Sequence, residues 1–186
     1  MDNSMKREQQ SEGERLIIAE YNAEWPRLFE EERVRIQGQI GAYVDDIQHI
    51  GSTAVTGLGA KPIIDIMIVI PRIEAVASCV PGLEKLDYHY MGEYGIAGRH
   101  YFYKPANASP FEHQYHLHML MAMHQQYLSH ILFRDYLRMH PEALTAYQRL
   151  KEELAARYIS DRDSYTDGKG QFVSSILALA QSETER

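Results

Sequence analysis

The stretch from His49 to Pro71 decides the fold: His-Ile-Gly-Ser-Thr-Ala-Val-Thr-Gly-Leu-Gly-Ala-Lys-Pro-Ile-Ile-Asp-Ile-Met-Ile-Val-Ile-Pro. Its second half, residues 63–70, is rich in β-branched side chains and ends at a proline, which predicts a buried strand. Asp65 interrupts this apolar run, and an unpaired carboxylate is expensive to bury. Asp65 is therefore expected at an open edge of the core, in an ion pair, or bound to a metal ion.

The first half of the stretch contains a small-residue turn at Gly51 and Ser52. Residues 44–50 before it have the pattern of another strand. Glycine-bearing turns that open into a helix bind anions readily, because several backbone N–H groups point outward together. The order strand, turn, strand with an acid therefore fits a phosphate site opposite a metal-binding carboxylate. An ordinary turn and a structural aspartate remain the alternative.

Length and composition indicate one globular domain. The chain has 186 residues and a formal net charge of −7, so no overall basic field supports a nucleic-acid polymer as partner. Cys79 is the sole cysteine, which excludes an internal disulfide. The apolar segments are too short to cross a bilayer, and we expect a cytoplasmic protein. We assign residues 15–181 to the domain, with a disordered tail at 1–14 and a second tail at 182–186.

The remaining pattern indicates strands first and helices last. This order predicts an α+β fold, a mixed sheet with helices on one face and a C-terminal helical cap. Residues 125–139 have helical periodicity until His140-Pro141 breaks it. Strands are expected at 16–21, 44–50, 63–70, 88–91, 99–104 and 115–122, with a turn at 105–112 between the last two; helices are expected at 26–40, 73–86 with an interruption at Pro81-Gly82, 125–139, 142–159 and 169–181.

A pair of histidines forms the second chemical signal. His116 and His118 stand two residues apart in the last predicted strand, so both imidazoles project from the same face. If Asp65 lies on a neighbouring strand, the three side chains can meet one divalent ion. Two nitrogens and one oxygen favour Mn²⁺, Zn²⁺ or Fe²⁺ over Mg²⁺, which prefers oxygen ligands. Such pairs also arise by chance on the polar face of a sheet.

Basic residues form the third signal. Lys61 precedes the Asp65 strand, and Arg99 and Lys104 bound the strand that follows a glycine-rich loop. Arg134, Lys151 and Lys169 belong to the predicted helical cap. Lys169 ends a segment, 165–169, that we expect to be a loop leading into a helix. If the cap folds over the sheet, these cations can hold phosphates; each alone is also compatible with a solvated surface charge.

Several motifs together resemble the GrpB family, also labelled UPF0157. They are residues 49–55, Lys-Pro-Ile-Ile-Asp-Ile at 61–66, Gly-Glu-Tyr-Gly-Ile at 92–96, His-Leu-His at 116–118 and Leu-Phe-Arg-Asp-Tyr-Leu at 132–137. The spaced pairs Tyr21-Asn22-x-x-Trp25 and Tyr165-x-x-x-Lys169 match its two ends. The resemblance extends from residue 17 to residue 180.

The resemblance implies a nucleotidyltransferase fold like the palm of polymerase β, with a nucleoside triphosphate on Gly51 and Ser52 and a metal on Asp65. Active members of that superfamily have a second acid two residues later, where this chain has Met67. Two-metal phosphoryl transfer needs such hard anionic ligands. The expectation is nucleotide binding with a divalent metal, with transfer of NMP to a small-molecule or protein hydroxyl as its finer form. A binding module without catalysis is the alternative, and a mononuclear metal hydrolase is a further one.

The expected site residues follow from these signals. Asp65 and Lys61 are the catalytic candidates, and Asp65, His116 and His118 are the metal ligands. The residues expected to bind nucleotide phosphates are Gly51, Ser52, Arg99, Lys104, Arg134 and Lys169.

Overall fold

A single mixed sheet organises the molecule. The computed structural model describes residues 16–106 and 109–184. Over these ranges the strands are β1 (Asp46–Ile50), β2 (Ile64–Ile70), β3 (His89–Tyr90), β4 (His100–Ala106) and β5 (Ser109–Met121), in the spatial order β1-β2-β5-β4-β3. The pair β2 and β5 is parallel, and the other neighbours are antiparallel. The predicted α+β class with a mixed sheet is confirmed.

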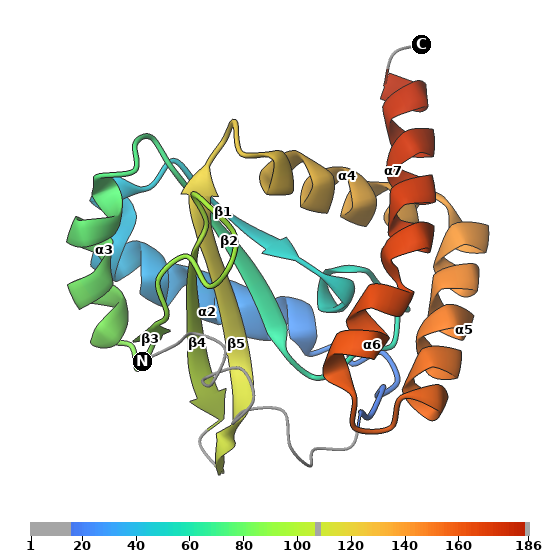
Figure 1. Cartoon of the computed structure of the whole chain (residues 1–186). Helices are drawn as coiled ribbons and strands as arrows, with labels where there is room; N and C mark the ends of the chain where they lie inside the picture. Colours follow the sequence, from blue (N-terminus) through green and yellow to red (C-terminus); the bar gives the residue numbers. More distant parts are fainter. Residues whose placement is uncertain (1–15, 107–108, 185–186) are drawn as a thin grey trace.

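The helices divide into two groups. They are α2 (Trp25–Ile40), α3 (Ala75–Glu84), α4 (Gln125–Met139), α5 (Pro141–Arg157), α6 (Arg162–Gly168) and α7 (Gly170–Thr184). In Figure 1, α2 and α3 cover one side of the sheet, whereas α5, α6 and α7 stand together beside β1 and β2 as the C-terminal cap. Between them, α4 crosses the other face of the sheet, where its Tyr127 and Ile131 pack on Ile50, Met67 and Leu120.

The main core lies under α2 and α3 because β2 alternates. Its even-numbered isoleucines, from Ile64 to Ile70, are at most 1% exposed and belong to the largest apolar cluster. Trp25, expected to be a core anchor, is 2% exposed in the same cluster. The odd-numbered side chains of β2, starting with Asp65, therefore point to the opposite face. The strand thus presents its only carboxylate on the side that faces the cap.

Prolines mark several element boundaries as predicted, but not all of them. Strand β2 ends before Pro71, and α4 and α5 meet at His140-Pro141. Pro81 lies inside α3, however, so the expected interruption at Pro81-Gly82 is wrong. Gly82 has a packing role instead: a Cβ there would stand 2.7 Å from Cγ2 of Ile40, so the glycine lets α3 lie directly against the end of α2.

Some expected bounds differ from the observed ones. The predicted strand at 16–21 is reduced to an isolated bridge between Ala19 and Ala60. The predicted turn at 105–112 overlaps the ends of β4 and β5, and α7 extends through Thr184 into the expected C-terminal tail. The expected tail at 1–14 lies outside the described residues. No helix in the described ranges is long and apolar enough to cross a membrane.

Candidate functional site: a two-part cleft around Asp65

Asp65 lies at the point where three backbone segments meet. It pairs in register with Ile50 at the end of β1 and with His116 in the middle of β5. The strand order therefore brings the end of the first strand and the predicted histidine strand to either side of the carboxylate. The side chain of Asp65 keeps 30% of its surface exposed, and it faces the cleft under the cap.

The turn after β1 closes around this carboxylate. Gly51 has a φ of 72°, and a Cβ built on it would stand 2.4 Å from Oδ2 of Asp65. Only a residue without a side chain fits both constraints. The next residues, Ser52–Ala54, form a single 3-10 turn. The predicted turn is thus placed directly beside the predicted acid.

Helix α4 holds both ends of this turn. Arg134 donates hydrogen bonds to the carbonyl oxygen of His49 at 2.8 Å and to Oε1 of Gln48 at 2.9 Å. One turn later on the helix, Arg138 donates to the carbonyl oxygen of Ala54 at 2.8 and 3.1 Å. Asp135 accepts from both guanidinium groups and orients them. We call this arrangement, Arg134 to Gln48 and His49 and Arg138 to Ala54, the arginine clamp.

Three histidines, His116, His118 and His130, lie near Asp65 and act on its pKa. Nδ1 of His116 lies 3.4 Å from Oδ1 of Asp65. Burial raises the pKa of Asp65, but the hydrogen bond and charge of His116 outweigh it and leave this pKa below its usual value. Burial lowers the pKa of His118 to about 3 and lowers that of His130, so both rings are neutral near pH 7. His130, on α4, was not expected from the sequence; its ring centroid lies 6.0 Å from that of His118.

The predicted metal ligands do not match a two-metal site. Met67, where a second acid would stand, is fully buried in an apolar cluster with Ile50 and Leu120. Among the residues that the structure describes, no three histidine, cysteine or acidic side chains are grouped so that they could hold a metal ion. Asp65 is thus the single hard anionic donor, whereas Mg²⁺ prefers several oxygen ligands. The donor set of a two-metal centre is therefore not present in this part of the chain.

The first part of the cleft is a cavity of about 260 Å³ that combines the turn with basic side chains. Its lining includes Ser52, Asp65 and His116 from the sheet side. The basic residues that line it are Lys61, Lys151, Arg162 and Lys169. They come from the β2 approach, from α5 and from the region of α6, segments far apart in the sequence. In a chain of net charge −7, this convergence of four cations on one cavity stands out.

Lys151 is the most buried of these cations. It is 2% exposed, donates a hydrogen bond to the carbonyl oxygen of Gly59 and lies 3.4 Å from Oγ of Ser52. Burial, together with the charge of Lys169, lowers the pKa of Lys151 to about 7. Burial also lowers the pKa of Lys169, while Asp65 acts in the opposite direction. Both ammonium groups are thus desolvated, which favours an anionic ligand that would share the cavity with them.

The second part of the cleft is a larger cavity of about 470 Å³. It shares Ser52, Asp65 and Lys169 with the first cavity. Its apolar lining consists of Val55, Phe133, Leu137, Tyr147 and Val173, and its polar lining includes Gln125, Gln126, Ser129 and His130. The turn and Asp65 therefore lie at the junction of a cationic part and an apolar part.

Two of the basic residues expected to bind phosphate lie outside both linings. Lys104 points to the opposite face of the sheet, where its Nζ pairs with Oε1 of Glu32 at 2.9 Å and lies 5.5 and 5.4 Å from the ring centroids of Tyr88 and Tyr115. Its place is a correction to our expectation, because β4 alternates and position 104 is in phase with the core. Arg99 donates to the backbone carbonyl oxygens of Glu93 and Tyr94 in the glycine-rich loop.

Arg134 lines the second cavity, but its donors are used by the arginine clamp. The segment 165–169, expected to be a loop, belongs mostly to α6. This short helix contributes Arg162, which the sequence analysis missed. Asp161 was the residue that could have indicated a helix start here. It is the N-cap of α6, and its side chain accepts a hydrogen bond from the backbone N–H of Ser164.

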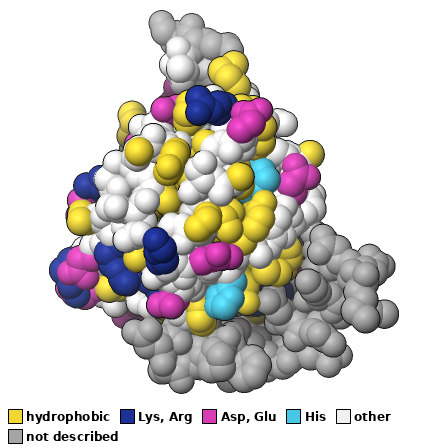
Figure 2. Space-filling model, turned by 90° about the vertical axis from the view of Figure 1, so that its left-hand side faces the viewer, with side chains coloured by type: hydrophobic (Ala, Val, Ile, Leu, Met, Phe, Trp, Pro, Cys, Tyr) yellow, Lys and Arg dark blue, Asp and Glu magenta, His cyan; other side chains and the backbone are white. Residues whose placement is uncertain are grey.

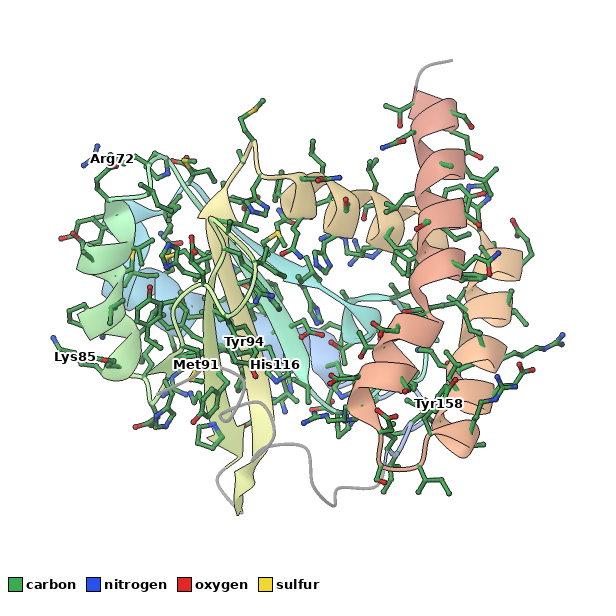
Figure 3. The ribbon with its side chains drawn as sticks, viewed as in Figure 1. Arg72, Lys85, Met91, Tyr94, His116 and Tyr158 are labelled. Carbon is green, nitrogen blue, oxygen red and sulfur yellow. The ribbon has the colours of Figure 1, made fainter. Side chains whose placement is uncertain are left out.

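Figure 3 places His116 over the sheet in the middle of the molecule, whereas Arg72 and Lys85 point outward near the two ends of α3. On the face seen in Figure 2, the side on which α3 lies in Figure 1, acidic and basic side chains are interspersed with apolar ones. The cleft differs from that surface because, over the described residues, Asp65 is the one acidic side chain in its lining and the other charged side chains there are lysines and arginines.

The sequence is similar to proteins of one family. A family profile described as GrpB protein matches residues 15–179. The UPF0157 protein YqkA of Bacillus subtilis is 39% identical over 153 residues, which are 82% of this chain but only 43% of that protein. The glutamate-rich protein GrpB of Alkalihalophilus pseudofirmus is 35% identical over 163 residues, 87% of this chain and 94% of that one.

Solved structures show the same relationship. The crystal structure of the conserved protein GrpB from Enterococcus faecalis has a TM-score of 0.83 at 34% identity and covers 91% of this chain and all of that chain. The Cid1 poly(U) polymerase with Mg 3′-dATP bound has a TM-score of 0.54 at 11% identity, over 83% of this chain and 47% of its own. The second likeness shows a nucleotidyltransferase-like fold and nothing further. With its profile match, its relatives and its fold in agreement, the chain belongs to the GrpB family.

Proposed function

We propose that this protein binds a nucleoside triphosphate in the two-part cleft, with the phosphates in the cationic cavity and the base in the apolar one. The observation that carries the proposal is the convergence of Lys61, Lys151, Arg162 and Lys169 on the cavity that holds Ser52. The fold shared with the nucleotidyltransferases supports the ligand class by analogy only.

The phosphate end of the ligand has suitable partners. Ammonium groups act as compact charges toward phosphate oxygens, and the guanidinium of Arg162 offers two parallel N–H donors. The hydroxyl of Ser52, at the junction, is placed to donate a hydrogen bond to a phosphate oxygen. The pKa of Lys151 is lowered by burial, and an adjacent anion would favour its charged form.

The base end fits the second cavity. Its apolar side chains, among them Phe133 and Val173, can cover the faces of a planar ring. Gln125, Gln126 and Ser129 at its edge offer donors and acceptors for the polar rim of a base. Because both cavities share Ser52 and Lys169, one ligand can extend from one to the other.

Binding without transfer is the form of the proposal that the cleft favours. NMP transfer with Asp65 and Lys61 as catalytic residues would need a second acid, and Met67 stands there, buried among apolar side chains. We therefore propose a nucleotide-binding module. The test below can also detect NMP transfer, which would contradict binding without catalysis.

The test is isothermal titration calorimetry with ATP, GTP, CTP and UTP, first with the unaltered protein. We expect saturable binding of at least one of them, and we expect Lys169→Gln to weaken it by about tenfold or more, because a charge-assisted hydrogen bond is lost. Binding that is absent for all four, or unchanged in Lys169→Gln, would overturn the proposal.

Lys85→Gln is the matched control. Lys85 is exposed at the end of α3, on the far side of the molecule from the cap (Figure 3), so the same charge is removed away from the cleft. Its affinity should equal that of the unaltered protein. Release of pyrophosphate during incubation with nucleotide and Mn²⁺ would show transfer and replace the binding module by an enzyme.

A further inference from the structure

The acid that would bind a second metal is replaced, and basic residues occupy the space around the remaining one. Met67 is fully buried and packs with Ile50 and Leu120 in an apolar cluster. The imidazole of His118, in register with Met67 on the next strand, has a buried Nδ1 with no hydrogen-bond partner in the described structure. Neither side chain supplies negative charge for a cation.

The positive charge that metal ions would bring is already present in the protein. A fully ionised nucleoside triphosphate has several negative charges on its phosphates, and a two-metal site offsets them with divalent ions. Here Lys61, Lys151, Arg162 and Lys169 line the same cavity as Asp65. Lys151 is fixed in place by its hydrogen bond to Gly59 and stands 3.4 Å from Oγ of Ser52.

We propose that the cleft recognises its nucleotide without a divalent metal, with Lys151, Arg162 and Lys169 in the role that Mg²⁺ has in nucleotidyltransferases. This inference rests on the proposed function and names the ligand as the free polyanion rather than its magnesium complex. Magnesium in solution then competes with the protein for the phosphates, because it neutralises the charge that the lysines recognise.

The experiment compares the affinity for each of the four nucleoside triphosphates in EDTA and in excess Mg²⁺. We expect a smaller dissociation constant in EDTA than in Mg²⁺, because magnesium competes for the phosphates. Binding that weakens or disappears in EDTA would overturn this inference and leave the proposed function intact. The absence of binding in both buffers would overturn both.

Variants make the test sharper. In EDTA, Lys151→Met and Arg162→Gln should each weaken binding by about tenfold or more, whereas Lys85→Gln should not change it. Met67→Asp restores the missing acid, and we expect its affinity to rise on addition of Mg²⁺, in contrast to the volume control Met67→Leu. If Met67→Asp does not fold, Lys151→Met in EDTA decides: unchanged affinity there would contradict the inference.

Discussion

The two faces of β2 have different surroundings. Toward α2 and α3, Ile64, Ile66 and Ile68 are at most 1% exposed and form the centre of the core. Toward the cap, Asp65 keeps 30% of its side chain exposed and lies beside His116. The comparison teaches that a period of two separates stability from chemistry within seven residues. Substitutions of these isoleucines should therefore change the free energy of unfolding, and a substitution at Asp65 should change ligand binding.

The largest effect is expected from Lys104→Met on the core face. The substitution leaves Glu32, which is 2% exposed, as a buried carboxylate without its lysine. We expect a loss of about 4 kcal/mol in the free energy of unfolding, measured by urea denaturation. The double variant Glu32→Leu with Lys104→Met should recover most of that loss. If folded Lys104→Met lost nucleotide binding, Lys104 would belong to the cleft after all.

Acid should destabilise the same face through His49. Its ring stacks on Phe29, and its Nε2 lies 3.0 Å from Oγ1 of Thr53. Burial, with the charges of Arg138 and Arg134, lowers the pKa of His49 to about 4. Below pH 6.5 the imidazole of His49 is protonated in the unfolded chain but stays neutral in the folded protein. The free energy of unfolding therefore falls until the pH reaches about 4.

We expect this residue to account for a loss of about 3 kcal/mol between pH 7 and pH 4. Urea denaturation at several pH values measures it. His49→Gln should lose less stability over that range; an equal loss would assign the effect to other groups.

On the cleft face, Gly51→Ala should affect binding more than stability. The new Cβ would meet Oδ2 of Asp65 at 2.4 Å, and the residue has a φ of 72°. We expect a cost of about 1–3 kcal/mol for the backbone conformation, with its ψ of −172°, and a loss of nucleotide binding by calorimetry. Gly57→Ala is the matched control, because Gly57 has a φ of 83° but nothing within 4 Å of its Cβ. It should share the loss of stability and keep the binding.

The smallest effect concerns the pH dependence of binding. Lys151 has a pKa lowered to about 7 by burial and by Lys169, with Glu152 acting in the opposite direction. A bound phosphate favours protonated Lys151, so affinity should fall as the pH rises above 7, by at most about tenfold per pH unit. Calorimetry in buffers of different ionisation enthalpy should show proton uptake at pH 8. In Lys151→Met this uptake should be absent.

The sequence predicted the parts of the cleft that depend on local pattern. Strand alternation placed Asp65 and His116 on one face, and the register of β2 and β5 made them neighbours. The turn at Gly51 and Ser52 was predicted from its small residues, and it lies directly after β1. Family resemblance, more than periodicity, pointed to the superfamily fold.

What the sequence did not predict depends on distant contacts. Lys104 is in phase with the core, and the position of Glu32 on α2, with the rings of Tyr88 and Tyr115, makes a buried lysine acceptable there. Arg134 was expected to bind phosphate, but besides the neighbouring Asp135 its acceptors are Gln48 and the His49 carbonyl oxygen, more than 80 residues away in the chain. Arg162 escaped notice because α6 has only seven residues and too few apolar positions to show a period.

The arginine clamp has a consequence for how this protein is assembled. The strands β1 and β2 can pair through their own backbones, since they are near neighbours in the chain. The bend between them is held at both ends by α4, which is synthesised long afterwards. A fragment that stops before Gln125 would therefore lack the arginines that hold the bend. The floor of the cleft takes its final shape only when the C-terminal third of the chain has folded onto it.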